Sequence, residues 1–348
     1  MTLAFRASRP GVWVLRDSDR STRLQLIEDF GQRLREAVAR VIVGKDAVVE
    51  LLAVALLCEG HVLIEDVPGL GKTTLAKVVA RCLDCSFSRI QFTPDLLPSD
   101  VTGIFYFDQK ASEFVFRAGP IHASIVLADE VNRATPRTQS SLLEAMEERQ
   151  VTVEGQTMRL PRPFMVLATQ NPIELEGTFP LPEAQLDRFL LRLALGYPSA
   201  VEEVAILRRF QTASPLDDVQ PVASSQQIMD LCKATREVYV SDAIAEYVVA
   251  LTQATRDHDT IELGASPRAS MALCRSAQAL AGLRGRDYVV PDDVKRLVGP
   301  VLGHRLILRH QGRLHGAATE RTLAAIVEAT RAPVEPLPEL SRGRPTPT

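Results

Sequence analysis

The chain has 348 residues, of which 46% are hydrophobic and 24% charged, and its formal net charge is −3. This length predicts two domains, and the near-neutral charge gives no basic field of the kind that binds nucleic acid or a membrane surface. No apolar run approaches the ~20 residues that a membrane span needs, and none near the N-terminus is long enough for a signal peptide. The five scattered cysteines argue against a disulfide framework, so we expect a cytoplasmic protein.

Residues 1–21 show no clear periodicity and are expected to form a weakly ordered N-terminal extension. From residue 22 on, short apolar strands alternate with amphipathic helices. This alternation predicts an α/β domain over residues 22–197, with a parallel sheet covered by helices on both faces. Its strands are expected at residues 61–64, 86–92, 124–130, 164–169 and 190–193.

Two predicted hairpins interrupt this alternation. The first joins aromatic-rich runs at residues 104–107 and 114–116, and the second joins residues 151–153 and 158–160 around Gly155. Exposed aromatic side chains on the first hairpin would mark a contact surface. Packing of these side chains against the parent domain is an equally weighted alternative.

The strand pattern ends at residue 197. Helical periodicity then continues to residue 331 and predicts a second, all-α domain over residues 198–331. Residues 332–348 contain five prolines and are expected to be a disordered tail. The fold class predicted from the whole chain is therefore an α/β core with a C-terminal helical domain.

The first core strand leads into a glycine-rich turn and a helix over residues 72–80. Backbone N–H groups of such a turn and of the helix N-terminus lack internal partners, so they can converge on phosphate oxygens. Lys72 can reach the β- and γ-phosphates, and the Thr73 hydroxyl can ligate Mg²⁺. The general phosphate-loop pattern would place a glycine at position 66, where this chain has Asp66. The expected nucleotide-binding residues of the turn are Pro68, Gly69, Leu70, Gly71, Lys72, Thr73 and Thr74.

Polar side chains follow two other core strands, at the sheet edge where ligands bind in open α/β folds. Asp129 and Glu130 end the strand at residues 124–130; Asp129 would hold Mg²⁺ and Glu130 would orient the attacking water. Capping of the following helix is the structural alternative for this acidic pair. Asn171 ends the next strand, where its amide could bond the γ-phosphate and the water, although Asn is also common in turns before Pro.

Two arginines complete the candidate hydrolytic set. Arg188 can act as a finger that stabilises charge on the γ-phosphate, whereas a salt bridge to Asp187 or Glu183 is the structural alternative. Arg268 begins a helix of the second domain and could reach across the interdomain cleft, coupling the nucleotide state to the angle of that domain.

Cysteine and histidine patterns suggest no further site. Cys82 and Cys85 have redox-like spacing but no second pair at zinc-finger spacing, so we interpret them as structural. His304, His310 and His315 do not share a helical face, and we expect them to be packing or surface residues.

In chain order, the phosphate loop, Asp129, Glu130, Asn171 and the two arginines resemble the AAA+ ATPases. Longer blocks at residues 129–134, 139–148, 168–172 and 177–189 are similar to the MoxR branch of that family. Val43 and Gly44 resemble its adenine-side motif. The resemblance spans residues 24–331 and implies a P-loop core with a helical lid, ATP and Mg²⁺ as cofactors, and hydrolysis of ATP to ADP and phosphate.

The resemblance also implies a homo-oligomer, usually a hexameric ring, in which Arg188 serves the adjacent subunit's site. Both hairpins would face the pore or the substrate side. Family members act as chaperone-like factors that remodel, mature or activate a protein client, often with a partner that carries a von Willebrand factor A domain. The alternative is a DNA-associated AAA+ motor or loader, which the net charge and the lack of a basic cluster on either hairpin disfavour. A scaffold that binds ATP without turnover is disfavoured by Glu130.

Overall fold

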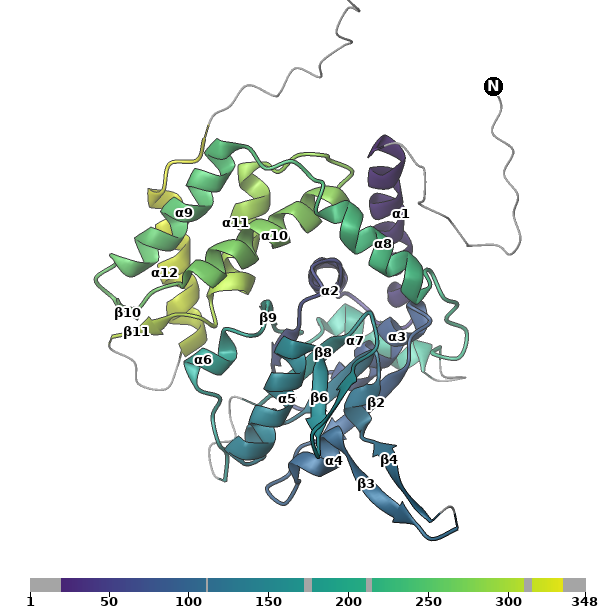
Figure 1. Ribbon diagram of the computed structural model, residues 1–348. Coiled ribbons are helices and arrows are strands. Elements are labelled where there is room, and N and C mark those ends of the chain that lie inside the picture. Colours follow the sequence, from purple (N-terminus) through teal and green to yellow (C-terminus); the bar gives the residue numbers. More distant parts are fainter. Residues whose placement is uncertain (1–19, 111, 172–176, 211–214, 310–314, 334–348) are drawn as a thin grey trace, which may run out of the picture.

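The computed structural model describes residues 20–110, 112–171, 177–210, 215–309 and 315–333. Its centre is a five-stranded parallel sheet in the order β2-β5-β8-β1-β9 (Figure 1). Because neighbouring strands run parallel, crossover segments connect them, and most of these contain helices, as the strand–helix alternation predicts. The strands are β1 (Val62–Glu65), β2 (Phe87–Gln91), β5 (Ile125–Asp129), β8 (Met165–Gln170) and β9 (Leu191–Leu193).

The central strands β1, β5 and β8 are buried on both faces of the sheet, because successive strand residues point to opposite faces and most residues of these three strands are apolar. Val62 and Ile64 pack in one cluster with α1 (Arg20–Ala39), α2 (Asp46–Leu57) and α3 (Lys72–Cys82). Leu63, between them, belongs to a second cluster with α5 (Pro136–Glu148). The predicted two-sided cover of the sheet is confirmed.

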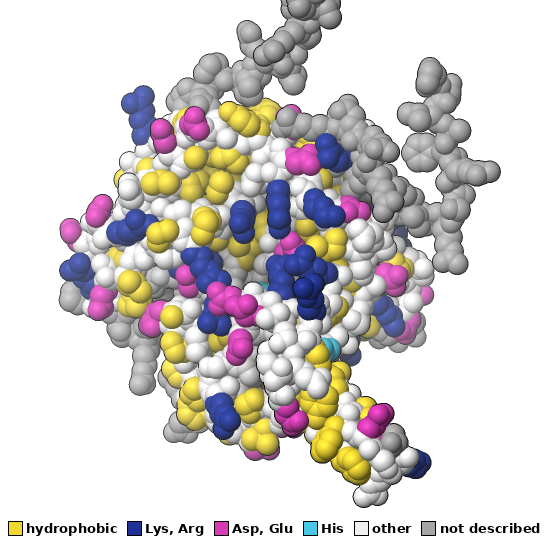
Figure 2. Space-filling model, in the orientation of Figure 1, with side chains coloured by type: hydrophobic (Ala, Val, Ile, Leu, Met, Phe, Trp, Pro, Cys, Tyr) yellow, Lys and Arg dark blue, Asp and Glu magenta, His cyan; other side chains and the backbone are white. Residues whose placement is uncertain are grey.

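The two hairpins are present as antiparallel ribbons: β3 (Gly103–Asp108) with β4 (Glu113–Ala118), after the short helix α4 (Pro98–Thr102), and β6 (Gln150–Val153) with β7 (Gln156–Arg159). The β3–β4 ribbon projects from the core (Figure 1). Figure 2 shows hydrophobic side chains along it, and Tyr106, Phe107 and Phe114 are 44%, 52% and 69% exposed. Its aromatic side chains are therefore not all packed against the parent domain.

The C-terminal part is helical, as expected. Serine side chains cap four of its helices by accepting a backbone N–H from the first turn. A small antiparallel ribbon of β10 (Ile261–Leu263) and β11 (Ile307–Leu308) is an addition to the predicted all-α arrangement. The helices are α7 (Ala200–Arg209), α8 (Ser225–Thr235), α9 (Asp242–Arg256), α10 (Pro267–Leu283), α11 (Pro291–Leu302) and α12 (His315–Ala329).

The first two helices join the core to the lid. Side chains of α1 and α2 share one continuous apolar cluster with α3 of the core and with α8 and α10 of the lid. Gly31 of α1 lies so close to Leu283 of α10 that an added Cβ would lie 2.6 Å from a Leu283 methyl group. The division at residues 197 and 198 stays a prediction, and nearly all of the predicted extension and tail lies outside the described residues. In the described part of the chain, no helix has the length and apolar character to span a membrane.

Candidate functional site

The predicted phosphate loop connects β1 to α3 at the carboxyl edge of the sheet. Gly69 and Gly71 have φ values of +86° and +83°, which only glycine adopts readily. Gly71 is the N-cap of α3, so the first N–H groups of that helix receive no capping side chain. Among the described residues, no heavy atom lies within 4 Å of a Cβ built on either glycine. The loop thus offers open space lined by backbone donors at a helix N-terminus, which suits a phosphate group.

Lys72 lies inside this loop. Its ammonium group donates to the carbonyl oxygens of Asp66 (2.9 Å) and Val67 (3.3 Å). Thr73 and Thr74 follow it in the half-buried first turn of α3, and Pro68 is exposed where the loop begins. The lysine therefore lies where phosphate oxygens could replace its carbonyl partners.

Asp66 is a functional candidate whose role the sequence did not reveal. Its Oδ2 accepts the backbone N–H groups of Leu195 (2.6 Å) and Gly196 (2.8 Å), and its Oδ1 accepts that of Val67 (3.0 Å). Lys45 donates to the carbonyl oxygen of the same Gly196 (3.1 Å). The departure from glycine at position 66 thus ties the phosphate loop to the segment that leads into the lid. The only signal for this role was an acid at a position where the general pattern has glycine.

A pocket beside the loop fits the predicted adenine side. It is lined by residues 41–43 and Lys45, by residues 69–71 and Thr74 of the loop, by Gly196 and Pro198, and by Ile206 and Phe210. Val43 lies in this lining. Gly44 is not in the lining, but its φ of +69° turns the chain there, and a Cβ would overlap the Glu202 carboxylate.

The two acids lie at the carboxyl edge of β5. Asp129 Oδ1 accepts the Thr169 hydroxyl (2.6 Å), and Asp129 Oδ2 accepts Arg89 Nη2 (2.7 Å). Glu130 has a left-handed backbone, with φ 58°, and its N–H donates to the same Thr169 hydroxyl (2.9 Å). A non-glycine residue in this conformation costs of order 1–3 kcal/mol and persists where surrounding contacts hold it, as the bond to Thr169 does here.

Side chains from the neighbouring strands hold the second acid and complete this edge. The Glu130 carboxylate accepts Gln91 Nε2 at 2.7 Å. Asn171, which is 7% exposed, follows β8, the strand that lies between β5 and β1. The structure therefore brings the loop, both acids and Asn171 to one edge of the sheet.

The two arginines lie at the opposite edge. Arg188 precedes β9, and Leu190 N–H donates to the carbonyl oxygen of His61 (2.8 Å), which precedes β1. The phosphate loop instead follows β1, and β9 runs parallel to β1. Since β1 has four residues, the two edges are separated by about 10 Å of strand. Arg188 therefore lies at the amino edge of the sheet, away from the phosphate loop of its own subunit.

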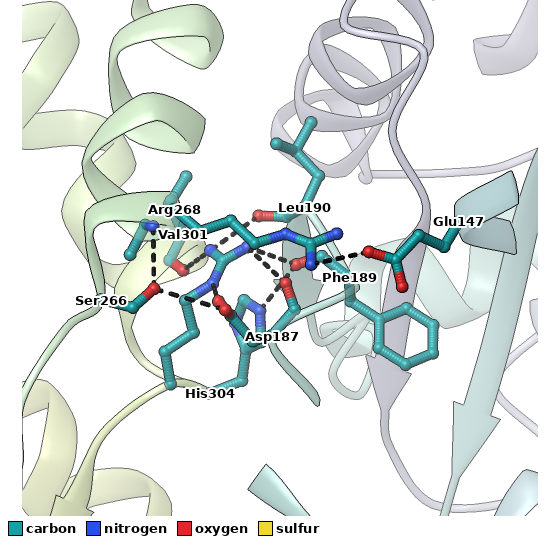
Figure 3. Close-up of polar contacts among 10 residues, drawn as sticks. Glu147, Asp187, Phe189, Leu190, Ser266, Arg268, Val301 and His304 are labelled. Carbon is teal, nitrogen blue, oxygen red and sulfur yellow. Dashed lines mark hydrogen bonds and ion pairs between the residues drawn. The ribbon is translucent and has the colours of Figure 1, made fainter. Parts of the chain in front are cut away.

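Glu147, near the end of α5, binds both arginines. Its Oε2 lies 3.2 Å from Arg188 Nε. Its Oε1 lies 3.2 Å from Arg268 Nη1 (Figure 3). Arg268 does cross from the lid to the core, but at the amino edge of the sheet and away from the phosphate loop. Arg188 does form a salt bridge, but its partner is Glu147 and not the predicted Asp187 or Glu183. Asp187 pairs with Arg305 instead (2.7 Å).

These arginines line a pocket that is rich in basic side chains. Arg149, Arg188, Arg268, Arg275 and Arg305 lie in its wall, against the three acids Glu59, Glu147 and Asp187. Figure 2 shows Lys and Arg side chains gathered on this face, where the lid meets the core. The excess of positive charge in this wall suits a negatively charged group.

The remaining candidates are structural. The five cysteines are free, and burial raises the pKa of Cys82 to about 12. His304 is buried, with Nε2 3.0 Å from the Phe189 carbonyl oxygen, and burial holds its pKa well below the ordinary value. In the described residues no cluster of His, Cys, Asp and Glu could hold a metal ion by itself. The side chains of His310 and His315 lie outside the described part of the chain.

Comparison with known proteins agrees with this geometry. The ATPase family associated with various cellular activities (AAA) matches residues 61–191, and an AAA lid domain matches residues 253–331. The chain is 49% identical over 300 residues to the uncharacterized protein YeaC of Bacillus subtilis, which covers 86% of this chain and 94% of YeaC. It is 42% identical over 305 residues to Chaperone MoxR1 of Mycobacterium tuberculosis, which covers 85% and 80% respectively. The crystal structure of a candidate ATPase from Cytophaga hutchinsonii is similar with a TM-score of 0.84 at 36% identity, over 90% of this chain and 98% of that one.

Proposed function

Since this chain belongs to the MoxR family of AAA+ ATPases, we propose that it hydrolyses ATP within a ring of identical subunits and thereby remodels a protein client. The observation that carries this proposal is the division of the hydrolytic residues between two edges of one sheet. The phosphate loop, Asp129, Glu130 and Asn171 lie at the carboxyl edge, whereas Arg188 and Arg268 lie at the amino edge. A complete site therefore needs the amino edge of a second copy. A head-to-tail contact forms a ring when its rotation closes, and we propose a closed ring of six subunits.

At the carboxyl edge, each residue would act on the subunit's own nucleotide. The N–H groups of the loop and of α3 would bind phosphate oxygens, and the Lys72 ammonium would move onto them from its carbonyl partners. Glu130, held by Gln91, would orient the water that attacks the γ-phosphate. The Asn171 amide would bond that water or the phosphate and so respond to which nucleotide is bound.

Thr73 and Asp129 offer the oxygen ligands that Mg²⁺ prefers. Thr169 and Arg89 already bind both carboxylate oxygens of Asp129, so this side chain would hold the ion through water and not directly. When bound, the ion would neutralise charge on the phosphate oxygens.

At the amino edge, the two arginines would act on the neighbour's nucleotide. Both are partly exposed, and their shared partner Glu147 holds them in place. An exposed ion pair is worth about 0–1 kcal/mol, so a γ-phosphate could displace this carboxylate. We therefore place Arg268 beside Arg188 in the neighbour's site, and no longer opposite the nucleotide of its own subunit.

The β3–β4 ribbon supports a protein client. It projects from the core and exposes Tyr106, Phe107 and Phe114, which suit an apolar protein surface. Its charged residues are balanced, with Asp108 and Glu113 against Lys110 and Arg117, and this balance disfavours the DNA-associated alternative. A partner with a von Willebrand factor A domain remains part of the proposal through the family alone.

Mixing two inactive variants tests the shared site. We expect Glu130→Gln and Arg188→Ala each to lose ATP turnover, because one lacks the residue that orients water and the other lacks the finger. An equal mixture should regain about a quarter of wild-type turnover, since a quarter of the contacts join an intact carboxyl edge to an intact arginine. Wild-type turnover by both variants alone would refute the proposed roles, and failure of the mixture to recover would refute the shared site.

A further inference from the structure

We propose that Arg305 is a positioning residue that fastens the segment carrying Arg188 to the lid. The position of the lid would then determine where Arg188 of one subunit lies relative to the nucleotide bound by the next subunit. This inference rests on the proposed function, in which Arg188 acts on the neighbour's nucleotide.

Arg305 follows α11 in the lid and is buried, with 7% of its surface exposed. Its Nε donates to Asp187 Oδ1 (2.7 Å), and its Nη2 donates to the carbonyl oxygens of Phe189 (2.7 Å) and Asp187 (3.4 Å). Its Nη1 donates to the carbonyl oxygens of Leu190 (3.3 Å) and of Val301, at the end of α11. One lid side chain thus binds the backbone on both sides of Arg188 (Figure 3).

Two other lid residues hold the same segment. His304 Nε2 lies 3.0 Å from the Phe189 carbonyl oxygen, and the Ser266 hydroxyl donates to Asp187 Oδ2 (3.3 Å). Ser266 is also the N-cap of α10, the helix that begins with the turn carrying Arg268. The lid therefore positions both arginines, one through its own helix and the other through bonds to residues 187–190.

The chemistry of arginine explains why this residue type is needed. A buried guanidinium must have its N–H groups partnered, and its rigid planar fork can bind a carboxylate and several carbonyl oxygens at once. A lysine keeps the charge but presents a single ammonium, so it cannot hold all these acceptors. Because Arg188 lies between Asp187 and Phe189, release of their carbonyl oxygens would let the finger move. A displacement of about 1 Å at a catalytic group can lower turnover by up to about 100-fold.

The experiment compares Arg305→Lys with a matched lid substitution, Arg286→Lys. Arg286 also pairs with a buried carboxylate, that of Asp293 (2.6 Å), but its partners lie within the lid. We expect Arg305→Lys to lower kcat about 10- to 100-fold, while the Kd for a fluorescent ATP analogue changes less than about twofold, since the nucleotide loop lies at the other edge. Arg286→Lys should keep wild-type kcat. Thermal unfolding of every variant is measured first, and Asp187→Asn decides the question if Arg305→Lys is unfolded at the assay temperature.

A doping assay then shows where the defect acts. Glu130→Gln subunits, with or without Arg305→Lys, are mixed in equal amounts with wild-type subunits. Both added variants lower the number of active sites equally. Only the variant with Arg305→Lys also offers its neighbours an Arg188 that is no longer held by Arg305. We expect turnover per wild-type subunit to fall to about half of the value measured with Glu130→Gln alone.

The outcomes separate the two proposals. Loss of turnover in Arg188→Ala, together with wild-type kcat in Arg305→Lys and Asp187→Asn, would overturn the positioning role and leave the shared site intact. Equal effects of the two dopants would also overturn it. Wild-type turnover in Arg188→Ala would instead refute the shared site, and the positioning role with it.

Discussion

His61 gives the fold a defined sensitivity to acid. This side chain is 6% exposed and lies where β1 begins. Its Nδ1 accepts the Val166 N–H and its Nε2 donates to the Met146 carbonyl oxygen, both at 3.0 Å, so the imidazole is neutral. Burial, with a smaller contribution from the positive charge of Arg149, lowers the pKa of His61 from 6.5 to about 4, although the bond to Met146 opposes the shift.

The sign of the effect follows from the two pKa values. The unfolded chain binds a proton at this position below pH 6.5, whereas the folded protein does not bind one until about pH 4. The stability contributed by neutral His61 is therefore fully present above pH 6.5 and is lost as the pH falls towards 4. A difference of about 2.5 pKa units corresponds to about 3.4 kcal/mol in full, of which about 3 kcal/mol is lost at pH 4 and about 2 kcal/mol at pH 5.

Urea unfolding of the wild type and of His61→Gln, at pH 7 and pH 5, measures this loss. The glutamine amide can accept from Val166 and donate to Met146 without titrating. We expect the wild type to lose about 2 kcal/mol more unfolding free energy than the variant between these pH values. Other buried histidines such as His304 contribute equally to both proteins. Equal losses in the two proteins would show that His61 is not held neutral by burial.

Three further predictions concern the candidate site. Asp66→Gly restores the general phosphate-loop pattern but removes the two hydrogen bonds that the Asp66 carboxylate accepts from Leu195 and Gly196. We therefore expect the free energy of unfolding in urea to fall by about 2–4 kcal/mol and ATP to bind more weakly. Unchanged ATP affinity would contradict the link between the loop and the segment that leads into the lid. Glu147→Gln should raise turnover by less than about fivefold, since it weakens an exposed pair that holds both arginines; abolished turnover would mean that the carboxylate itself is required. The double variant Phe107→Ser, Phe114→Ser should keep basal ATP turnover and lose any stimulation of that turnover by client protein, because both side chains are exposed on the ribbon. Persistent stimulation would show that the client does not bind this ribbon.

Local sequence patterns predicted the elements and the carboxyl edge of the site well. Runs of buried apolar residues identified the core strands, and the glycine pair before Lys72 identified the loop, because these signals depend on neighbours in the chain. The open sheet then placed Asp129, Glu130 and Asn171 together, as expected for side chains that follow parallel strands.

Contacts between distant segments could not be predicted in the same way. Asp66 binds the backbone of Leu195 and Asp187 pairs with Arg305, in each case more than a hundred residues away along the chain. Periodicity carries no information about which distant N–H group or guanidinium a carboxylate will meet. For the same reason the sequence indicated that Arg268 crosses the cleft but not at which edge of the sheet, and it missed the β10–β11 ribbon, whose strands are too short to show a period.

Strand β9 connects the two edges of the sheet that the proposed function assigns to different nucleotides. Its three residues begin just after Arg188 and end just before Leu195 and Gly196, the two residues that Asp66 binds. Seven residue steps, at most about 23 Å, thus connect Arg188, which we propose to act on a neighbour's nucleotide, with the segment that binds Asp66 of the phosphate loop. In a closed ring these short strands would be rigid spacers between successive sites. Under the proposed function, a change at one nucleotide would then reach the next site through this short strand.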